Sequence, residues 1–363
     1  MLSQELQLSA RTGCEHILGD ARRFCVHLND HGQVLSASAG EILLSRTLGN
    51  SLEGGLGRMF LRVHGSDSIE LHTLLGATSG LSDFACDGEV AQWRGHLAGC
   101  RVELGLRVDV EAATLLWDVS VENQSTEPVR IDTVWVQDVG LASRGALLSN
   151  EAYTAHYLDE SVIQDANCGP VLSFRQNLQQ GGKNPWLMAA CLSGAASYAT
   201  DAFDVYGNGY RCGEGASGLK QQSLSNRCYQ YEFSCAALQS NPVDLASAGS
   251  ARFSYAAAYV VDHPEASSEV DLSVLERMRA LSGQSLGDPL DLQALPESNL
   301  VVQAEPVHGR DLSQAQLQDL FPSKWRHTES REGAVMSFFC DADTHVVTRA
   351  KEALIERPHG TIL

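Results

Sequence analysis

The alternation of apolar and polar residues is the clearest signal in the sequence. Every second residue is apolar along residues 101–111, and the same pattern returns along 115–122 after a three-residue link. A period of two places the apolar side chains on one face of a strand, so the two runs predict a hairpin of half-buried strands. Residues 129–136, 229–238 and 252–261 predict further strands.

Polar turns separate these runs, and almost nothing before residue 265 has helical spacing. The pattern therefore predicts an all-β fold, a large antiparallel β-super-sandwich over residues 1–262. Ser268 and Asp271 then form a capping-box pattern ahead of a helix, and a second short helix is expected at 312–321. We expect a helical linker over residues 263–330 and a β hairpin over 331–363, with strands at 335–340 and 345–348.

Charge narrows the range of partners. The 363 residues include 26 Lys and Arg against 45 Asp and Glu, a net charge of -19. Such an excess of negative charge repels nucleic acid and anionic membranes, so neither is expected as a partner. The sequence has no apolar run near the ~20 residues that cross a bilayer and no secretory signal pattern, which predicts a cytoplasmic location.

The cysteines and histidines do not predict a metal site. The 10 Cys contain no CxxC pair and the 12 His contain no HxH or HExxH spacing. Structural zinc sites take their ligands from tight pairs, so we expect these cysteines to be small buried residues and no metal to be bound. Gly181, Gly182 and Lys183 resemble part of a phosphate loop, but Asn184 and Pro185 follow them, which predicts a turn.

Two segments, 150–157 and 175–186, combine aromatic rings, amides and cations. Rings stack on the C–H faces of sugars while amides and guanidinium groups bind hydroxyls, so this mixture is typical of carbohydrate sites. The alternative is that these are polar loops whose aromatic residues close the edge of the sandwich. The candidate substrate-binding residues are Asn150, Glu151, Tyr153, Tyr157, Arg175, Gln176, Asn177, Lys183 and Trp186. No catalytic residue is assigned, because the sequence cannot rank carboxylate pairs among 45 acids.

These segments also carry a family resemblance. The sequence resembles glycoside hydrolase family 94, in particular its 1,2-β-oligoglucan phosphorylases and the phosphorylase-like part of cyclic β-1,2-glucan synthases. The stretches that carry the resemblance, in family order, are LGNSLEGG (48–55), FLRVH (60–64), NEAY (150–153), RQN through PW (175–186), YQYEF (229–233), ALQS (237–240) and ERPHG (356–360).

The resemblance implies a mutarotase-like β-super-sandwich, a helical linker and then an (α/α)6 catalytic barrel. It implies inverting phosphorolysis of a β-1,2-glucan, with inorganic phosphate as co-substrate and no other cofactor. The general acid and the phosphate-binding residues of that family lie in the barrel. We expect this barrel to follow Leu363, because the chain ends abruptly at an apolar pair with no polar tail. This chain is therefore expected to be non-catalytic, to shape β-glucan binding, and to pack on the barrel of the same or a companion chain and in a homodimer.

Two alternatives stay open. The chain could stand alone as a β-glucan-binding module, acting through the loops at 153–157 and 175–186. It could also be a mutarotase-like sugar enzyme, which needs a histidine and a carboxylate converging on one face of a sheet. His156 and Glu151 are the candidates for that pair.

Overall fold

The computed structural model describes residues 16–46, 49, 55, 57–76, 79–207, 216–231, 233–282, 290–295, 312–331, 333–341 and 344–348. The chain forms two compact units, Met1–Leu300 and Val301–Leu363. None of the helices among the described residues is long and apolar enough to cross a membrane. The expected division into residues 1–262, 263–330 and 331–363 stays a prediction.

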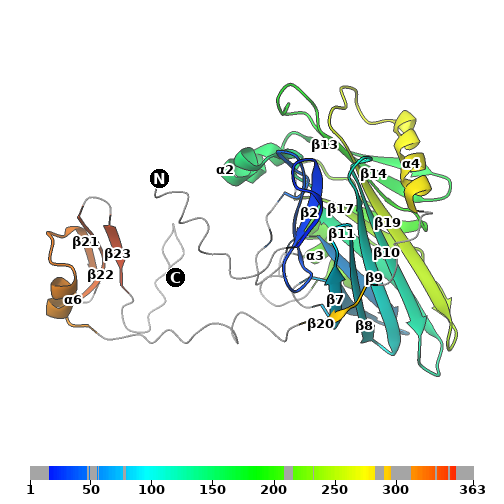
Figure 1. Ribbon diagram of the computed structural model, residues 1–363, viewed down its shortest axis with the longest axis horizontal. Coiled ribbons are helices and arrows are strands. Elements are labelled where there is room, and N and C mark those ends of the chain that lie inside the picture. The colour runs from blue at the N-terminus through cyan, green and yellow to red at the C-terminus, as the bar shows by residue number, and fades with distance from the viewer. Residues whose placement is uncertain are drawn as a thin grey trace. The chain divides into compact units, whose positions relative to one another are not determined.

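The larger sheet of the first unit has nine antiparallel strands (Figure 1). Its strands, in spatial order, are β13 (Leu158–Asp165), β14 (Gly169–Gln176), β15 (Trp186–Cys191), β19 (Ser250–Val260), β10 (Thr114–Asn123), β9 (Cys100–Asp109), β8 (Val90–Leu97), β7 (Asp83–Cys86) and β20 (Gln293–Ala294). Strands β9 and β10 form the predicted hairpin, in which Leu106 is opposite Trp117. The strand predicted at 252–261 is β19.

Two further sheets complete the first unit. The six-stranded sheet contains β16 (Ala195–Asp201), β17 (Ser234–Ser240), β11 (Val129–Asp138), β5 (Arg58–His64) and β6 (Ile69–Leu75), with β18 (Val243–Leu245) paired to β11. The five-stranded sheet contains β1 (His16–Asp20), β2 (Phe24–Leu28), β3 (Val34–Ala39), β4 (Ile42–Leu43) and β12 (Ala142–Ser143). Trp135 on β11 contacts Tyr255 on β19 with ring centroids 5.9 Å apart, inside the main core. The prediction of a large antiparallel all-β sandwich is confirmed.

Two predictions about local structure were wrong. Residues Arg144–Ala155 form helix α2 instead of a loop, with the Ser143 side chain accepting from the amide of Ala146 as its N-cap. Asn150 has non-helical dihedral angles (φ -163°, ψ 86°), so α2 is two short pieces whose apolar periodicity is too brief to recognise. The strand expected at 229–238 begins at Ser234. A further short helix, α3 (Ala202–Tyr206), follows β16, and a 3-10 turn, η2, spans Gly218–Lys220.

The helix predicted after residue 268 covers the outer face of the nine-stranded sheet. The turn η3 (Glu269–Asp271) begins with the predicted capping box of Ser268 and Asp271, and α4 (Leu272–Ser282) follows it. Leu275 and Met278 are buried against side chains of β10, β15 and β19 that point away from the main core. This helix therefore closes a second apolar layer.

The second unit is a small helix-and-hairpin fold. It contains α6 (Gln314–Leu320), β21 (Arg326–Arg331), β22 (Ala334–Cys340) and β23 (Thr344–Val347), and the predicted short helix and hairpin are both present. Phe338 is fully buried there, and the ring of Trp325 stacks on it at 3.9 Å. The ERPHG stretch at 356–360 lies outside the described residues.

Candidate functional site

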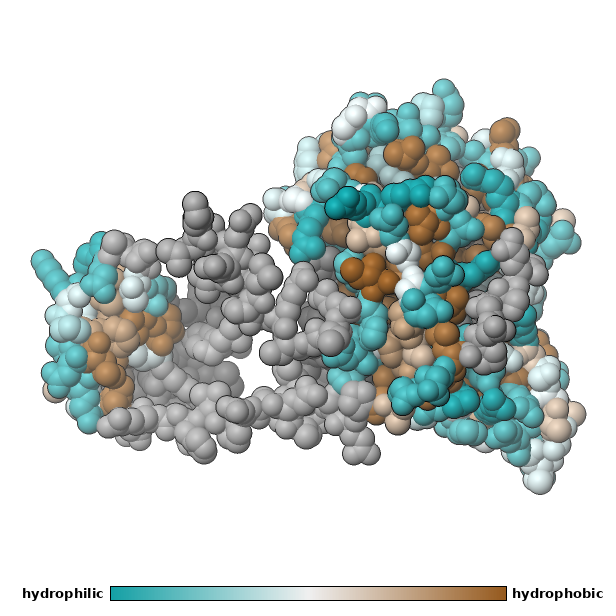
Figure 2. Space-filling model, in the orientation of Figure 1, coloured by the Kyte–Doolittle hydropathy of each residue, from teal (hydrophilic) through white to brown (hydrophobic). Residues whose placement is uncertain are grey.

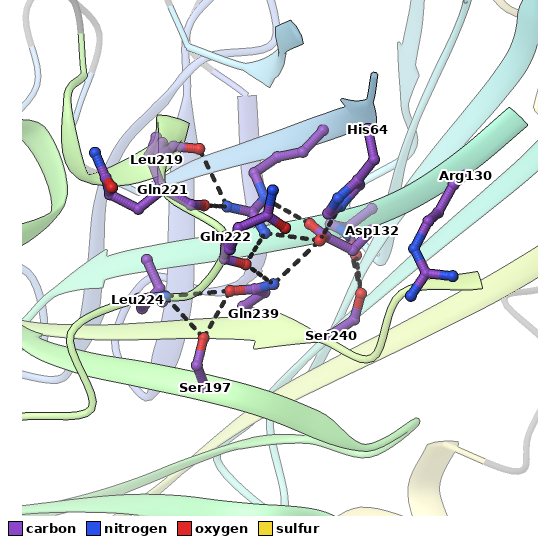
Figure 3. Close-up of polar contacts among 12 residues, drawn as sticks. His64, Arg130, Asp132, Ser197, Leu219, Gln221, Gln222, Leu224, Gln239 and Ser240 are labelled. Carbon is purple, nitrogen blue, oxygen red and sulfur yellow. Dashed lines mark hydrogen bonds and ion pairs between the residues drawn. The ribbon is translucent and has the colours of Figure 1, made fainter. Parts of the chain in front are cut away.

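A buried ion network lies on β5 and β11, at the FLRVH stretch (Figure 3). Arg62 donates two 2.7 Å hydrogen bonds to the carboxylate of Asp132, and neither side chain is exposed. His64 and Gln239 contact the same carboxylate at 2.7 and 3.1 Å. The remaining Arg62 bonds go to the carbonyl oxygens of residues 219, 221 and 222. The charged groups of this network bind one another and the backbone of residues 219–222. The network therefore holds the segment around η2 on the sheet.

The segment 175–186 anchors the start of the linker. The Nε and Nη2 of Arg175 donate to the carbonyls of His263 and Pro264 at 2.6 and 2.7 Å, and its Nη1 donates to Asn177. The indole of Trp186 is fully buried, stacks on the His263 ring at 4.8 Å, and donates to the Ser267 hydroxyl at 2.8 Å. We call this set of contacts the linker clamp.

Replacing Trp186 with alanine is expected to destabilise the first unit by about 3–5 kcal/mol, because a buried ring is lost and a cavity remains. Trp186→Phe keeps a ring to stack on His263 but loses the bond to Ser267, and is expected to cost less. Thermal unfolding measures both. Trp325→Ala, the same change in the second unit, is the control. If Trp325→Ala lowered the unfolding temperature of the first unit as much as Trp186→Ala does, Trp186 would not be the residue that stabilises the linker clamp.

The other predicted residues of this segment also make structural contacts. Gln176 is buried, donating to the carbonyl of Thr154 at 3.1 Å and accepting from the amide of Leu178 at 3.0 Å. Lys183 is exposed and closes a tight turn with Gln180 through two backbone bonds, in which Gly181 and Gly182 have positive φ. The predicted turn at 181–183 is therefore present.

The second half of α2 presents exposed rings. The Asn150 side chain accepts from the amide of Tyr153 at 3.0 Å and so caps this half of the helix. Tyr153 and Tyr157 are 49% and 37% exposed, and their hydroxyls lie 3.1 Å apart with the rings edge to face at 5.2 Å. Elsewhere on the face of the first unit seen in Figure 2, apolar residues are interspersed with polar ones.

Tyr231 extends this exposed aromatic group. It is 62% exposed, and its ring meets His156 edge to face at 6.2 Å. Tyr153, His156, Tyr157 and Tyr231 together are called the α2 surface. Glu151 belongs to the same helix, but it precedes His156 by five positions, which is about 140° around a helix axis at 3.6 residues per turn. The two candidates for a mutarotase-like pair therefore lie on different sides of α2.

Next to the α2 surface is a group of buried charges centred on Arg46. Its guanidinium lies 4.2 Å from the centre of the Phe233 ring. Burial lowers the pKa of Arg46, while the carboxylates of Glu151, Asp138, Glu160 and Asp201 act in the opposite direction. Arg46 thus lies between the exposed Glu151 of α2 and buried acids of β11, β13 and β16.

Glu160 on β13 belongs to this group and has a raised pKa. Its side chain is 4% exposed, and the hydroxyls of Ser234 and Thr200 face its carboxyl group. Burial raises the pKa of Glu160 to about 8, and the charge of Asp201 adds to this. The hydroxyls of Ser234 and Thr200 and the charge of Arg46 oppose the rise. This environment favours the neutral form of the Glu160 carboxyl.

The described residues contain no group of three or more His, Cys, Asp or Glu arranged to hold a metal ion. A pocket of about 480 Å³ lies elsewhere, between the five-stranded sheet, the β9–β10 turn, the end of β19 and Arg277 of α4, and contains none of the predicted site residues. The site presents exposed rings beside buried acids and a buried arginine. Exposed rings of this kind can stack on the C–H faces of a neutral, polyhydroxylated ligand.

Sequence reasoning missed Glu160, Arg46 and Tyr231 as members of one site. Glu160 stands in the sequence LDESVIQD, whose mixed polarity indicates an exposed edge strand. Its carboxyl group instead faces Thr200 of β16 and Ser234 of β17, which lie 40 and 74 positions further along the chain. Tyr231 lies in the stretch YQYEF (229–233), which carries the family resemblance and which the alternation pattern predicted as the start of a strand.

Family models match two parts of this chain. The model of the SOGP N-terminal domain matches residues 27–256, and the model of the glycoside phosphorylase supersandwich domain matches residues 321–363. The chain belongs to the SOGP N-terminal domain family and is related to glycoside phosphorylases.

One curated relative is the 1,2-beta-oligoglucan phosphorylase of Listeria innocua serovar 6a. The chain is 31% identical to it over 332 residues, which cover 92% of this chain and 29% of that protein. The chain thus spans 29% of the length of this curated relative. The family resemblance predicted from the sequence is confirmed.

Two solved structures illustrate the similarities found at the level of the fold. A putative aldose 1-epimerase from Escherichia coli K12 is 12% identical, covers 68% of this chain and 99% of its own, and has a TM-score of 0.38. A putative kojibiose phosphorylase from the human microbiome is 10% identical, covers 62% of this chain and 25% of its own, and has a TM-score of 0.35.

Proposed function

We propose that this chain is the N-terminal, non-catalytic part of an inverting β-1,2-oligoglucan phosphorylase, acting in the cytoplasm, and that its α2 surface contacts the glucan. The observation that carries the proposal is the pair of exposed tyrosines, Tyr153 and Tyr157, held in one geometry by their hydroxyl contact. Rigid exposed rings stack on sugar C–H faces with little loss of side-chain entropy. The relationship to a 1,2-beta-oligoglucan phosphorylase supports a glucan as the ligand.

Calorimetry with β-1,2-glucan oligosaccharides tests the α2 surface. We expect saturable binding, weakened about tenfold by Tyr153→Ala or Tyr157→Ala because a stacking ring is worth roughly 1.4 kcal/mol. Phe339→Ala, which removes an exposed ring of the second unit, is the control and should leave the affinity unchanged. A folded protein that releases no heat at millimolar sugar would overturn both this proposal and a stand-alone glucan-binding module.

An activity assay tests the non-catalytic assignment. We propose that the general acid and the phosphate-binding residues lie in a barrel outside this chain, as the family resemblance implies. The pure chain is then expected to release no glucose 1-phosphate from β-1,2-glucan and inorganic phosphate. We propose that an (α/α)6 domain, in the same or a companion chain, supplies these groups, and that a homodimer is the assembled form. Phosphate-dependent release of glucose 1-phosphate by this chain alone would refute the assignment.

A further inference from the structure

One short segment bridges the free edges of the two main sheets. Strand β16 is the last strand of the six-stranded sheet, and β13 is the last strand of the nine-stranded sheet. Residues 226–231, which we call the seam strip, hydrogen-bond to both. An exposed strand edge leaves unpaired backbone groups, so a segment that covers two edges at once stabilises both.

The contacts with β16 run along its edge. The amide of Asn226 donates to the carbonyl of Tyr198 at 2.9 Å, and the amide of Tyr198 donates to the Asn226 side chain at 3.2 Å. The Thr200 hydroxyl accepts from the amide of Tyr229 at 2.9 Å and donates to its carbonyl at 3.2 Å. This side of the strip is thus held by four hydrogen bonds.

The contacts with β13 converge on one residue, Glu160. The Gln230 side chain accepts from the Glu160 amide at 3.1 Å and donates to the Glu160 carbonyl at 2.6 Å. The Cys228 thiol donates to the same carbonyl at 3.4 Å. Tyr231, which meets the ring of His156 at the C-terminal end of α2, follows Gln230 directly. The placement of Tyr231 therefore depends on the backbone of Glu160.

The side chain of Glu160 is buried where the elements of the seam meet. The groups that face it are Thr200 and Asp201 of β16, Ser234 and Cys235 of β17, Arg46 after β4, and Cys228 of the strip. Asp201 repels a charge on Glu160, and Arg46, the one cation among these groups, is itself shared with Asp138, Glu151 and Asp201. A negative charge at this position is therefore poorly compensated.

We propose that Glu160 is a positioning residue that couples a proton to closure of the seam strip: as a neutral acid it keeps the strip closed and Tyr231 beside His156, and its ionisation opens the strip. The consequence for glucan binding rests on the function proposed above, whereas the closure itself does not. An open strip exposes the carboxyl to water, where it ionises readily, so protons favour the closed form.

The direction of the pH dependence follows from proton linkage. An open, solvated Glu160 has its ordinary pKa near 4.5, while the closed form holds the proton until about pH 8. Opening therefore becomes about tenfold more favourable for each pH unit between roughly 5 and 8, and levels off above that range.

Hydrogen exchange measured by mass spectrometry tests the closure. Protection of the amides of Asn226, Tyr229 and Glu160, corrected for the intrinsic exchange rate, is expected to fall about fiftyfold between pH 6 and pH 8. In Glu160→Gln the same protection should not change with pH. Glu127→Gln, at an exposed turn, is the control and should behave as the wild-type protein.

Two results would overturn the proposal. One is hydrogen-exchange protection of the seam-strip amides that does not change with pH in the wild-type protein. The other is a fall in protection that the strip shares equally with β10 in the core, since this would reflect unfolding of the whole unit. Calorimetry at both pH values then separates the two proposals: loss of protection with unchanged glucan affinity would leave the closure intact and place Tyr231 outside the glucan site.

Discussion

Glu160→Gln is expected to raise the free energy of unfolding at pH 8 by about 3–5 kcal/mol and to change it by less than about 1 kcal/mol at pH 4.5. The unfolded chain loses the Glu160 proton near pH 4.5, but the folded protein keeps it until about pH 8. Between these values the folded state binds more protons, so the stability of the wild-type protein falls as pH rises. The difference between the pKa of Glu160 in the unfolded and the folded protein corresponds to at most about 5 kcal/mol, at 1.36 kcal/mol per pH unit.

Urea unfolding at pH 4.5, 6 and 8 measures this effect. The difference between Glu160→Gln and wild type should grow steadily with pH and stop growing above pH 8, because glutamine has the shape of the neutral acid and does not ionise. The Glu127→Gln control should show no such growth. A constant difference between the variant and the wild type at all three pH values would show that Glu160 ionises normally in the folded protein.

Asp132→Ala is expected to destabilise the first unit by about 3–5 kcal/mol, because it leaves the Arg62 guanidinium buried without its counter-charge. Arg62 has no exposed surface and cannot turn towards water. Removing both charges with apolar residues of similar volume, as in R62M combined with D132L, should cost less than Asp132→Ala. Unfolding in urea compares the three proteins.

A surface ion pair on the same strand provides the contrast. Arg130 contacts Asp244 at 2.8 Å, but the two side chains are 50% and 71% exposed. Asp244→Ala is therefore expected to change stability by no more than about 1 kcal/mol. Equal effects of Asp132→Ala and Asp244→Ala would refute the distinction drawn between the buried network and the surface pair.

The sequence predicted those parts of the fold that depend on local patterns. The β9–β10 hairpin follows from strict alternation, and the helix after Ser268 follows from its capping box, because both signals involve neighbouring residues. Helix α2 was missed because the backbone of Asn150 interrupts it, leaving two pieces that are each too short for a periodic pattern.

The site was less predictable because its members come from distant segments. Tyr153, Tyr157 and Trp186 were all predicted as substrate-binding residues. The two tyrosines are exposed, whereas Trp186 is buried against the linker. Ring chemistry alone cannot separate the two cases. The raised pKa of Glu160 arises from burial by β16, β17 and the seam strip, which no local pattern around residue 160 reveals.

The position of α4 on the nine-stranded sheet has a practical consequence for protein engineering. A shortened expression product that stops at residue 262 would lack Leu275 and Met278 and leave the apolar residues beneath them facing solvent. Such a product should be prone to aggregation, whereas one that ends just beyond Ser282 keeps this cover in place.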